Sequence, residues 1–185
     1  SIFINQFLLL PYIISSYANN FGKVTTVEYK SSTQFYLKDK VEGTPWITKL
    51  PFPVQCVGKL EVKDEVTGVR FTNEYTYHHG YYDHFEREFR GFGRVDQTDT
   101  ETFADFIKSD ATNIVNEELY QPPVLTKTWY HTGAFLDRET VLDQFSKEYF
   151  VNEEFDEYHL PQPALPDEWT VQEWREALRA CKGMV

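Results

Sequence analysis

The feature that most constrains the fold is a pair of segments with alternating apolar and polar residues on either side of Gly68. In the first segment the two parities are Val54, Cys56, Leu60 and Val62 against Gln55, Lys59, Glu61 and Lys63. In the second they are Val69, Phe71, Tyr75 and Tyr77 against Arg70, Thr72, Glu74 and Thr76. Successive side chains of a β-strand point to opposite faces, so each segment predicts a strand with one apolar face. The turn signal at residues 66–68 joins the two strands into an antiparallel hairpin.

Two further strands are expected before this hairpin. Residues 8–17 are apolar and residues 23–30 are rich in β-branched side chains, and both patterns are typical of strands. Asn and Gly between them, at residues 18–22, favour a turn. We expect a polar loop over residues 31–45 and a short paired segment at residues 46–50.

A third strand of the hairpin system is expected over residues 86–99, after a turn at residues 80–83. Gly91 and Gly93 lie inside this strand, where glycine is unusual. They indicate a bulge or a close approach of another group to the backbone. Residues 1–101 are therefore predicted to form antiparallel β hairpins.

The C-terminal part mixes strand and helix signals. The expected order is an irregular or helical connection over 102–123, a strand over 124–136, a helix over 137–150 and a C-terminal helix over 167–183. Asp137 can cap the first helix, whose apolar face contains Val141, Leu142, Phe145 and Tyr149. Thr170 and Glu173 have the spacing of a capping box, and Gly183 can end the last helix.

Together these elements predict a mainly β fold, with long antiparallel hairpins and two or three short helices that cover one face. A chain of 185 residues has the size of one domain. Because it begins with Ser1 and its single methionine is Met184, we expect residues 1–185 to be a single fragment of a larger protein. The apolar run at residues 7–14 is too short for a membrane helix and lacks the features of a signal peptide.

The charge excludes some classes of partner. The chain has 18 basic and 29 acidic residues, a net charge of −11, which disfavours phosphate backbones and anionic membrane surfaces. We therefore expect no nucleic-acid partner and no direct membrane insertion. Cys56 and Cys181 are too far apart in sequence to form a zinc-ligand pattern or a disulfide framework, and both lie on apolar faces of predicted elements.

The strongest candidate for a metal site is a cluster near the expected turn. It consists of His78, His79, Asp83 and His84, which carry imidazole and carboxylate groups of the kind that bind divalent metals. Strand alternation argues against this site, because it directs His78 and His79 to opposite faces. We therefore predict no metal and no cofactor, and keep these four residues as the alternative.

Two other patterns could carry chemistry or binding. Glu86 and Glu88 share a strand face, as a carboxylate pair in a hydrolase would. Interleaved arginines favour ion pairs instead, so we predict no catalytic residue. Trp129, Tyr130 and Tyr82 could form an exposed aromatic platform for a carbohydrate, but core packing is the favoured interpretation for aromatic residues in such a β-rich chain.

Several long motifs resemble a known family. They lie at residues 11–37, 44–57, 67–101, 122–135 and 173–185. The most specific is the run YHHGYYDHFEREFRGFGRV, which begins at Tyr77. These segments resemble the middle region of the B component of bacterial Tc insecticidal toxins, the TcdB/TcaC-like proteins. The same region is related to SpvB-like virulence proteins and to proteins with YD/RHS repeats. The resemblance is weakest over residues 103–120 and 150–165.

The resemblance implies a structural role. In Tc toxins the B and C components form a hollow shell of β-strands around the toxic C-terminal region of the C component, and a propeller in the B component docks onto the channel of the A component. We therefore expect a non-catalytic segment of this shell, with the C component and the A-component channel as partners, in a secreted toxin complex. A metal-binding or carbohydrate-binding β-rich module is the alternative function.

Overall fold

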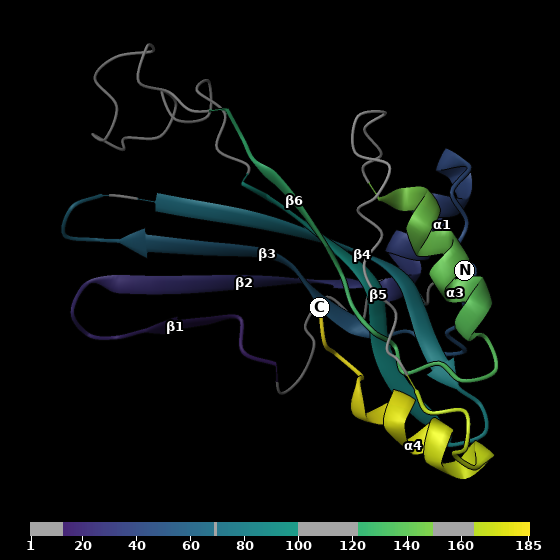
Figure 1. Cartoon of the computed structure of the whole chain (residues 1–185). Coiled ribbons are helices and arrows are strands. Elements are labelled where there is room, and N and C mark those ends of the chain that lie inside the picture. Colours follow the sequence, from purple (N-terminus) through teal and green to yellow (C-terminus); the bar gives the residue numbers. More distant parts are fainter. Residues whose placement is uncertain (1–12, 69, 100–121, 150–164) are drawn as a thin grey trace, which may run out of the picture. The chain divides into compact units, whose positions relative to one another are not determined.

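A computed structural model describes residues 13–68, 70–99, 122–149 and 165–185 (Figure 1). Its strands form a six-stranded sheet in which neighbours in sequence are neighbours in the sheet. The strands are β1 (Ser16–Ala18), β2 (Lys23–Ser31), β3 (Gln55–Asp64), β4 (Arg70–Asp83), β5 (Glu88–Asp99) and β6 (Leu125–Trp129). The helices are α1 (Ser32–Glu42), α3 (Arg138–Glu148) and α4 (Val171–Ala180). The predicted mainly β fold is confirmed.

The chain divides into two compact units. The first contains residues 1–30, 57–75 and 97–125, and the second contains residues 31–56, 76–96 and 126–185. Strands β3, β4 and β5 each contribute residues to both units. The histidine pair His78 and His79 and the β4–β5 turn at residues 84–87 both lie in the second unit.

The first unit contains the predicted hairpin. Strands β3 and β4 pair antiparallel with Val62 opposite Phe71, and Asp64 accepts a hydrogen bond from the backbone N–H of Val66 in the turn. One expectation is wrong here: Phe71 lies on the predicted apolar face but is 64% exposed. The described residues of this unit contain no helix that could cover that face.

Helix α1 replaces the polar loop expected over residues 31–45. The Ser31 side chain accepts a hydrogen bond from the backbone N–H of Thr33 and begins the helix. Gly43 ends it with a φ of 85°, a left-handed conformation that glycine adopts readily. Phe35 and Asp39, four residues apart on one side of the helix, are buried. The sequence contains both capping residues, but the residues between them are mostly polar, so the pattern did not predict a helix.

Other boundaries also differ from the expectations. Strand β4 continues through residues 80–83, and the turn follows at residues 84–87. Residues 46–50 form no strand, and β6 ends at Trp129, short of residue 136. The expected elements at residues 8–12 and 102–120 lie outside the described residues. By contrast, the capping box of α4 is confirmed, with hydrogen bonds in both directions between Thr170 and Glu173.

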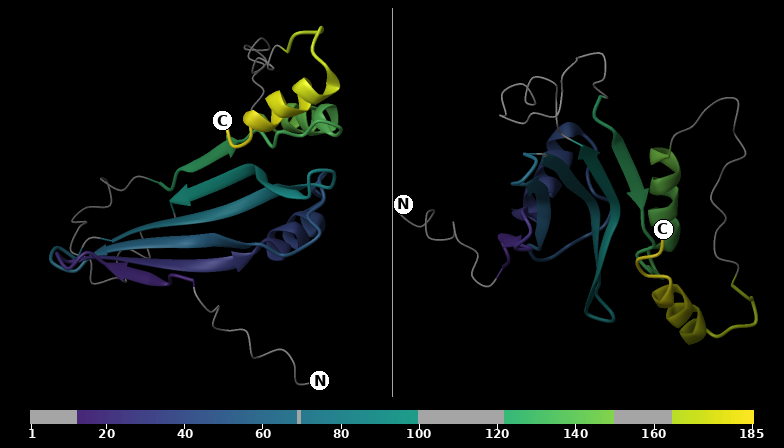
Figure 2. Two further views of the ribbon diagram at one scale, coloured as in Figure 1. Left: turned by 90° about the horizontal axis from the view of Figure 1, so that it is seen from below. Right: turned by 90° about the vertical axis from the view of Figure 1, so that its left-hand side faces the viewer.

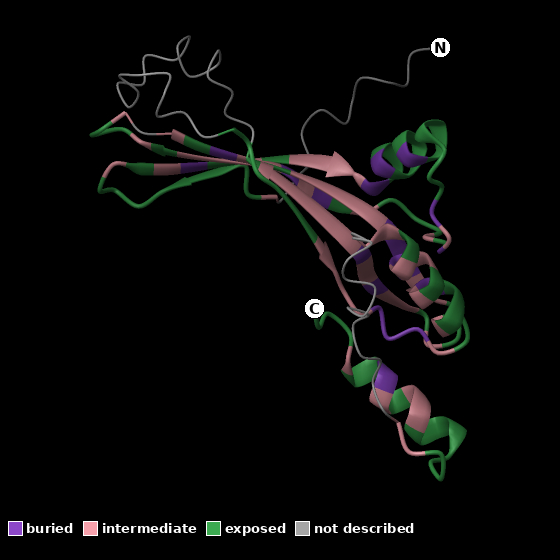
Figure 3. Cartoon of the chain, turned by 45° about the horizontal axis from the view of Figure 1, so that its top comes forward, coloured by how far each residue is buried: buried purple, intermediate pink, exposed green. Residues whose placement is uncertain are grey.

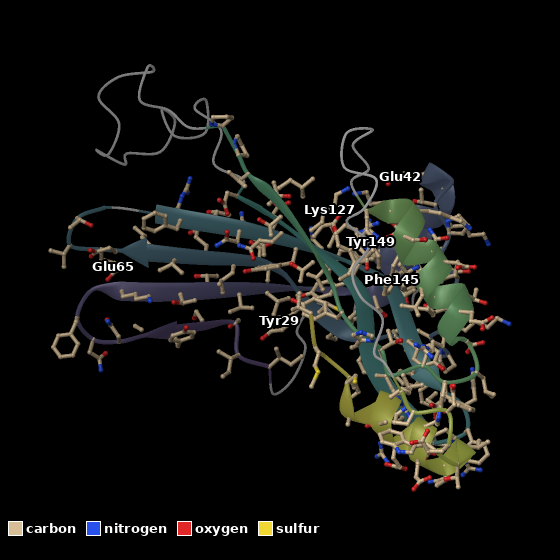
Figure 4. The ribbon with its side chains drawn as sticks, viewed as in Figure 1. Tyr29, Glu42, Glu65, Lys127, Phe145 and Tyr149 are labelled. Atoms are coloured by element: carbon tan, nitrogen blue, oxygen red, sulfur yellow. The ribbon has the colours of Figure 1, made fainter. Side chains whose placement is uncertain are left out.

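Two buried clusters attach helices to the sheet of the second unit. The first contains Tyr81, Ala134, Val141 and Phe145, with the partly buried Ile47, Trp129 and Tyr149 against it. The second contains Phe35, Trp46 and Cys56, with Leu50, Val54, Tyr77 and Phe92 against it. Buried positions occupy only part of the surface of α1 and of α3 (Figure 3). Phe145 and Tyr149 extend from the side of α3 that faces the strands (Figure 4).

Two glycines let large side chains come close to the strand backbone. A Cβ atom on Gly93 would lie 2.6 Å from Cζ of Phe145 in α3. A Cβ atom on Gly80 would lie 2.8 Å from Cζ3 of Trp46 and 3.1 Å from Cε1 of Phe92. The close approach predicted at Gly93 is confirmed, and its cause is the Phe145 ring.

We expect Gly93→Ala to lower the free energy of unfolding by about 1–3 kcal/mol, because the new methyl group overpacks a rigid ring. Gly58→Ala is the matched control in β3. Its Cβ would meet only side-chain carbons of Lys30, which is flexible and can move aside, so the change should stay within about 1 kcal/mol. Urea denaturation monitored by circular dichroism measures both, and equal losses would contradict the packing argument.

Candidate functional site

The two adjacent histidines of β4 have partners on different helices. Nδ1 of His78 lies 2.6 Å from Oδ2 of Asp39 in α1. Nε2 of His79 lies 2.7 Å from Oε1 of Glu148 in α3. The predicted divergence of the two rings is therefore confirmed. His79 has a φ of 56°, which is uncommon for a residue other than glycine, and its side chain is 3% exposed.

Both ring nitrogens of His78 face polar groups. Besides the contact of Nδ1 with Asp39, Nε2 lies 3.6 Å from Oδ2 of Asp96 in β5 and 3.3 Å from Oγ1 of Thr76. Asp39 also accepts a hydrogen bond of 2.6 Å from Nε1 of Trp46. The ring is thus held between a carboxylate of α1 and a carboxylate of the sheet.

Besides His79 of β4, the partners of Glu148 come from its own helix and from two further strands. Its carboxylate accepts hydrogen bonds from Nη1 of Arg94 at 2.6 Å, from Nε2 of Gln144 at 2.8 Å and from Nε1 of Trp129 at 3.3 Å. Trp129 also packs edge-on against Tyr149 at the end of α3, and α3 lies alongside β6 (Figure 2). Arg94 further binds Asp96 through Nε at 2.9 Å. A continuous chain of charged groups therefore runs from α1 through the sheet to α3.

The surroundings shift the pKa values of this chain of groups. Burial alone would lower the pKa of His78, but its hydrogen bonds to Asp39 and Asp96 outweigh burial and raise it. Burial alone would raise the pKa of Asp96, but the His78 hydrogen bond and the Arg94 charge lower it. For Glu148, burial is likewise outweighed by His79, Gln144 and Arg94, and its pKa falls to about 2. The network is thus built to hold charged carboxylates.

This geometry resembles a catalytic triad but lacks its electrostatics. Thr76, His78 and Asp39 have the order hydroxyl, imidazole and carboxylate. A general base must have a free lone pair on the nitrogen that faces the hydroxyl. Here Asp96 faces that same nitrogen and favours the protonated ring. The arrangement holds an imidazolium in place and is poorly suited to accept a proton from Thr76.

The remaining members of the histidine cluster lie apart from these contacts. Asp83 pairs with Nη2 of Arg90 at 2.9 Å and accepts backbone hydrogen bonds in the turn that follows it. The His84 ring packs against Tyr82, with ring centroids 5.2 Å apart. Within the described residues, no three His, Cys, Asp or Glu side chains form a group that could hold a metal ion. The metal alternative gains no support from this geometry.

The glutamates near the β4–β5 turn bind basic residues of the C-terminal segment. Glu86 pairs with Arg175 of α4, whose guanidinium lies 3.9 Å from the ring centroid of Phe85. Glu88 pairs with Nζ of Lys182 at 2.7 Å. The predicted pairing with an interleaved arginine is confirmed for Glu88, which lies 3.3 Å from Nε of Arg90. The other partners, Arg175 in α4 and Lys182 just after it, lie 89 and 94 residues further along the chain. Sequence spacing gave no signal for that pairing.

Two hollows lie in the second unit. One, of about 420 Å³, lies between α1 and residues 46–53 and has Tyr36, Trp46 and Phe52 in its walls. The other, of about 310 Å³, lies between the β4–β5 turn and α4 and includes the exposed Phe85, Leu136 and Val171. The favoured core packing of Trp129 is confirmed, because its side chain is partly buried against the first cluster and its indole N–H donates to Glu148.

Cys56 is unlike a catalytic nucleophile. Burial raises the pKa of the Cys56 thiol to about 11, so this group stays protonated and poorly nucleophilic at neutral pH. Both cysteines are free. None of the helices in the described ranges is long and apolar enough to cross a membrane.

Comparisons with known proteins identify related sequences and structures. The family described as the insecticide toxin TcdB middle/N-terminal region matches residues 6–133. A search of curated proteins gave no match.

Solved structures of similar sequence also match. A chain in the crystal structure of TcdB2-TccC3-Cdc42 is 36% identical over 74% of this chain, with a TM-score of 0.59. A chain in TcdB2-TccC3 is 30% identical over 92%, with a TM-score of 0.65. A chain in a mutant Tc holotoxin pore of Photorhabdus luminescens is 31% identical over 94%, with a TM-score of 0.68. This chain spans only 6% to 8% of the length of these three chains.

We expect Glu148→Gln to lower the free energy of unfolding by about 2 kcal/mol at neutral pH, because it leaves Arg94 and His79 without their partly buried carboxylate. Glu139→Gln is the matched control, since Glu139 is exposed in the first turn of the same helix and should matter by less than about 1 kcal/mol. Urea denaturation measures both variants.

The stability of the wild type and of Glu148→Gln, compared at several pH values, tests the pH dependence of the Glu148 contribution. The pKa of Glu148 is lowered by folding, so its contribution is present above its ordinary pKa and is lost as the pH falls toward 2. The stability difference between the wild type and Glu148→Gln should therefore shrink steadily below about pH 4.5. A difference that stays constant down to pH 2.5 would contradict the assignment.

Proposed function

Because the chain belongs to the TcdB middle/N-terminal region family of insecticide toxins, we propose that it is a non-catalytic segment of a Tc-toxin B component. In this role it forms part of the wall of the β-shell that encloses a toxic C component. The observation that carries the proposal is the match of 92% to 94% of the chain to two chains whose structures are titled as TcdB2-TccC3 and as a Tc holotoxin pore.

The sheet itself supports a wall role. Each strand pairs with its neighbour in sequence, and the two end strands are β1 and β6. All three residues of β1 are exposed, as are Leu125 and the two residues after it in β6. An end strand exposes unpaired backbone groups that favour the addition of another strand. In the proposed shell, strands from outside residues 1–185 pair with these ends.

The polar groups that lie buried or partly buried between helices and strands support a role without catalysis. His78, His79 and Glu148 are each engaged in contacts between a helix and a strand. Such contacts set the distance and orientation of layers, which is what a wall requires. The paired carboxylates at Glu86 and Glu88 hold the C-terminal segment in the same way.

The partners follow from the same resemblance. The solved complexes contain TcdB2 with TccC3, and one is a holotoxin pore. We propose a C component and an A-component channel as the partners of the larger protein, and secretion as part of the toxin complex. These residues would contribute geometry to both contacts and no nucleic-acid or membrane binding.

The test is to co-express the full polypeptide that carries these residues with its C component and to digest the complex with a protease. The toxic region of the C component should survive in the wild-type complex. Tyr81→Ala, which empties a buried cluster, should expose that region to cleavage, whereas His84→Asn at an exposed position should not. Cleavage of the toxic region at the rate of the free C component in the wild type would overturn the proposal.

A further inference from the structure

A histidine ring between two carboxylates connects helix α1 to the sheet. Asp39 is 3% exposed and lies in the middle of the buried side of α1. It shares the His78 ring with Asp96 of β5. His78 is therefore the only described side chain that touches both a carboxylate of α1 and a carboxylate of the sheet.

The charge on the ring decides how well this arrangement holds. A protonated imidazole donates from both nitrogens and can satisfy both carboxylates, whereas a neutral ring donates from only one. When Nδ1–H is kept for Asp39, the lone pair of a neutral ring points toward Oδ2 of Asp96, 3.6 Å away. The attraction between ring and sheet is then lost, and the carboxylate of Asp39 remains buried with one fewer positive charge beside it.

The other groups around the ring do not replace that charge. Trp46 gives Asp39 a neutral N–H, and Thr76 offers Nε2 a neutral hydroxyl. Arg94 binds Asp96 from the far side, and Lys127 of β6 acts on Asp96 electrostatically. Among the described residues, the side-chain partners of Asp39 are Trp46 and His78, and only the His78 ring can carry a positive charge.

We propose that His78 is a pH-sensitive latch, which holds α1 against the sheet while the imidazole is protonated and loosens it when the proton is lost. The sign follows from the geometry. Two carboxylates favour the charged ring in the folded state, so the contribution is complete at mildly acidic pH and is lost as the pH rises through the pKa of folded His78. The apolar contact of Phe35 with Tyr77 remains, so α1 is expected to loosen and not to leave.

His79 provides a natural comparison one residue away. It too binds a helical carboxylate, but Glu148 also receives the permanently charged guanidinium of Arg94. Glu148 therefore keeps a permanently charged partner, whereas Asp39 keeps no cation once His78 loses its proton. We expect α3 to stay attached over the pH range in which α1 loosens.

The test uses two indole N–H groups as reporters in the 185-residue chain. Trp46 donates to Asp39, and Trp129 donates to Glu148, so each indole reports on one carboxylate. In ¹H–¹⁵N spectra from about pH 5 to pH 9, the Trp46 signal should shift with a midpoint above the ordinary histidine pKa of about 6.5. The Trp129 signal should shift much less. Amide exchange in α1, corrected for its intrinsic pH dependence, should accelerate by roughly tenfold across the same midpoint.

Two variants make the result decisive. His78→Gln should abolish the titration of the Trp46 signal and make α1 exchange rapidly at every pH. Asp96→Asn keeps the ring but removes one of its carboxylates, so it should lower the midpoint. The latch is overturned if the Trp46 signal titrates unchanged in His78→Gln, if the midpoint is unchanged in Asp96→Asn, or if α1 and α3 loosen together in the wild type.

Discussion

The second unit depends on the partly buried carboxylate of Glu148. A carboxylate is costly to remove from water unless cations and hydrogen-bond donors surround it. Arg94, His79 and Trp129 meet that requirement, and they come from strands β5, β4 and β6. Placing this one side chain therefore fixes α3 across three strands at once. The tight packing of Phe145 on Gly93 follows from the same placement.

The consequence for function is that the chemically versatile groups serve to position layers. Asp39 on α1 and Glu148 on α3 bind adjacent histidines of a single strand, and Arg94 with Asp96 completes the connection between them. Apolar packing alone would tolerate several arrangements of the helices on the sheet. By the hypothesis that buried ionic contacts increase structural specificity, these contacts favour one arrangement. The proposed role in a shell wall would require fixed geometry of this sort.

The sequence predicts the parts of the fold that local patterns encode. Alternation around Gly68 predicts the β3–β4 hairpin, and the spacing of Thr170 and Glu173 predicts the start of α4. Helix α1 was missed because its apolar positions are few, although Ser31 and Gly43 mark its ends. The charged network could not be predicted, because His78 and Asp39 are 39 residues apart and His79 and Glu148 are 69 apart. Only the opposite orientation of the two histidines followed from the strand period.

That the chain acts as one part of a larger wall is tested most directly by hydrogen exchange at the two end strands. The assembled complex with its C component is compared with the isolated 185-residue chain, and β3 and β4 serve as internal controls because they pair on both sides in either case. If outside strands complete the sheet, amides of β1 and β6 become protected in the complex while those of β3 and β4 change little. Equal exchange of β1 and β6 in both samples would contradict the wall role.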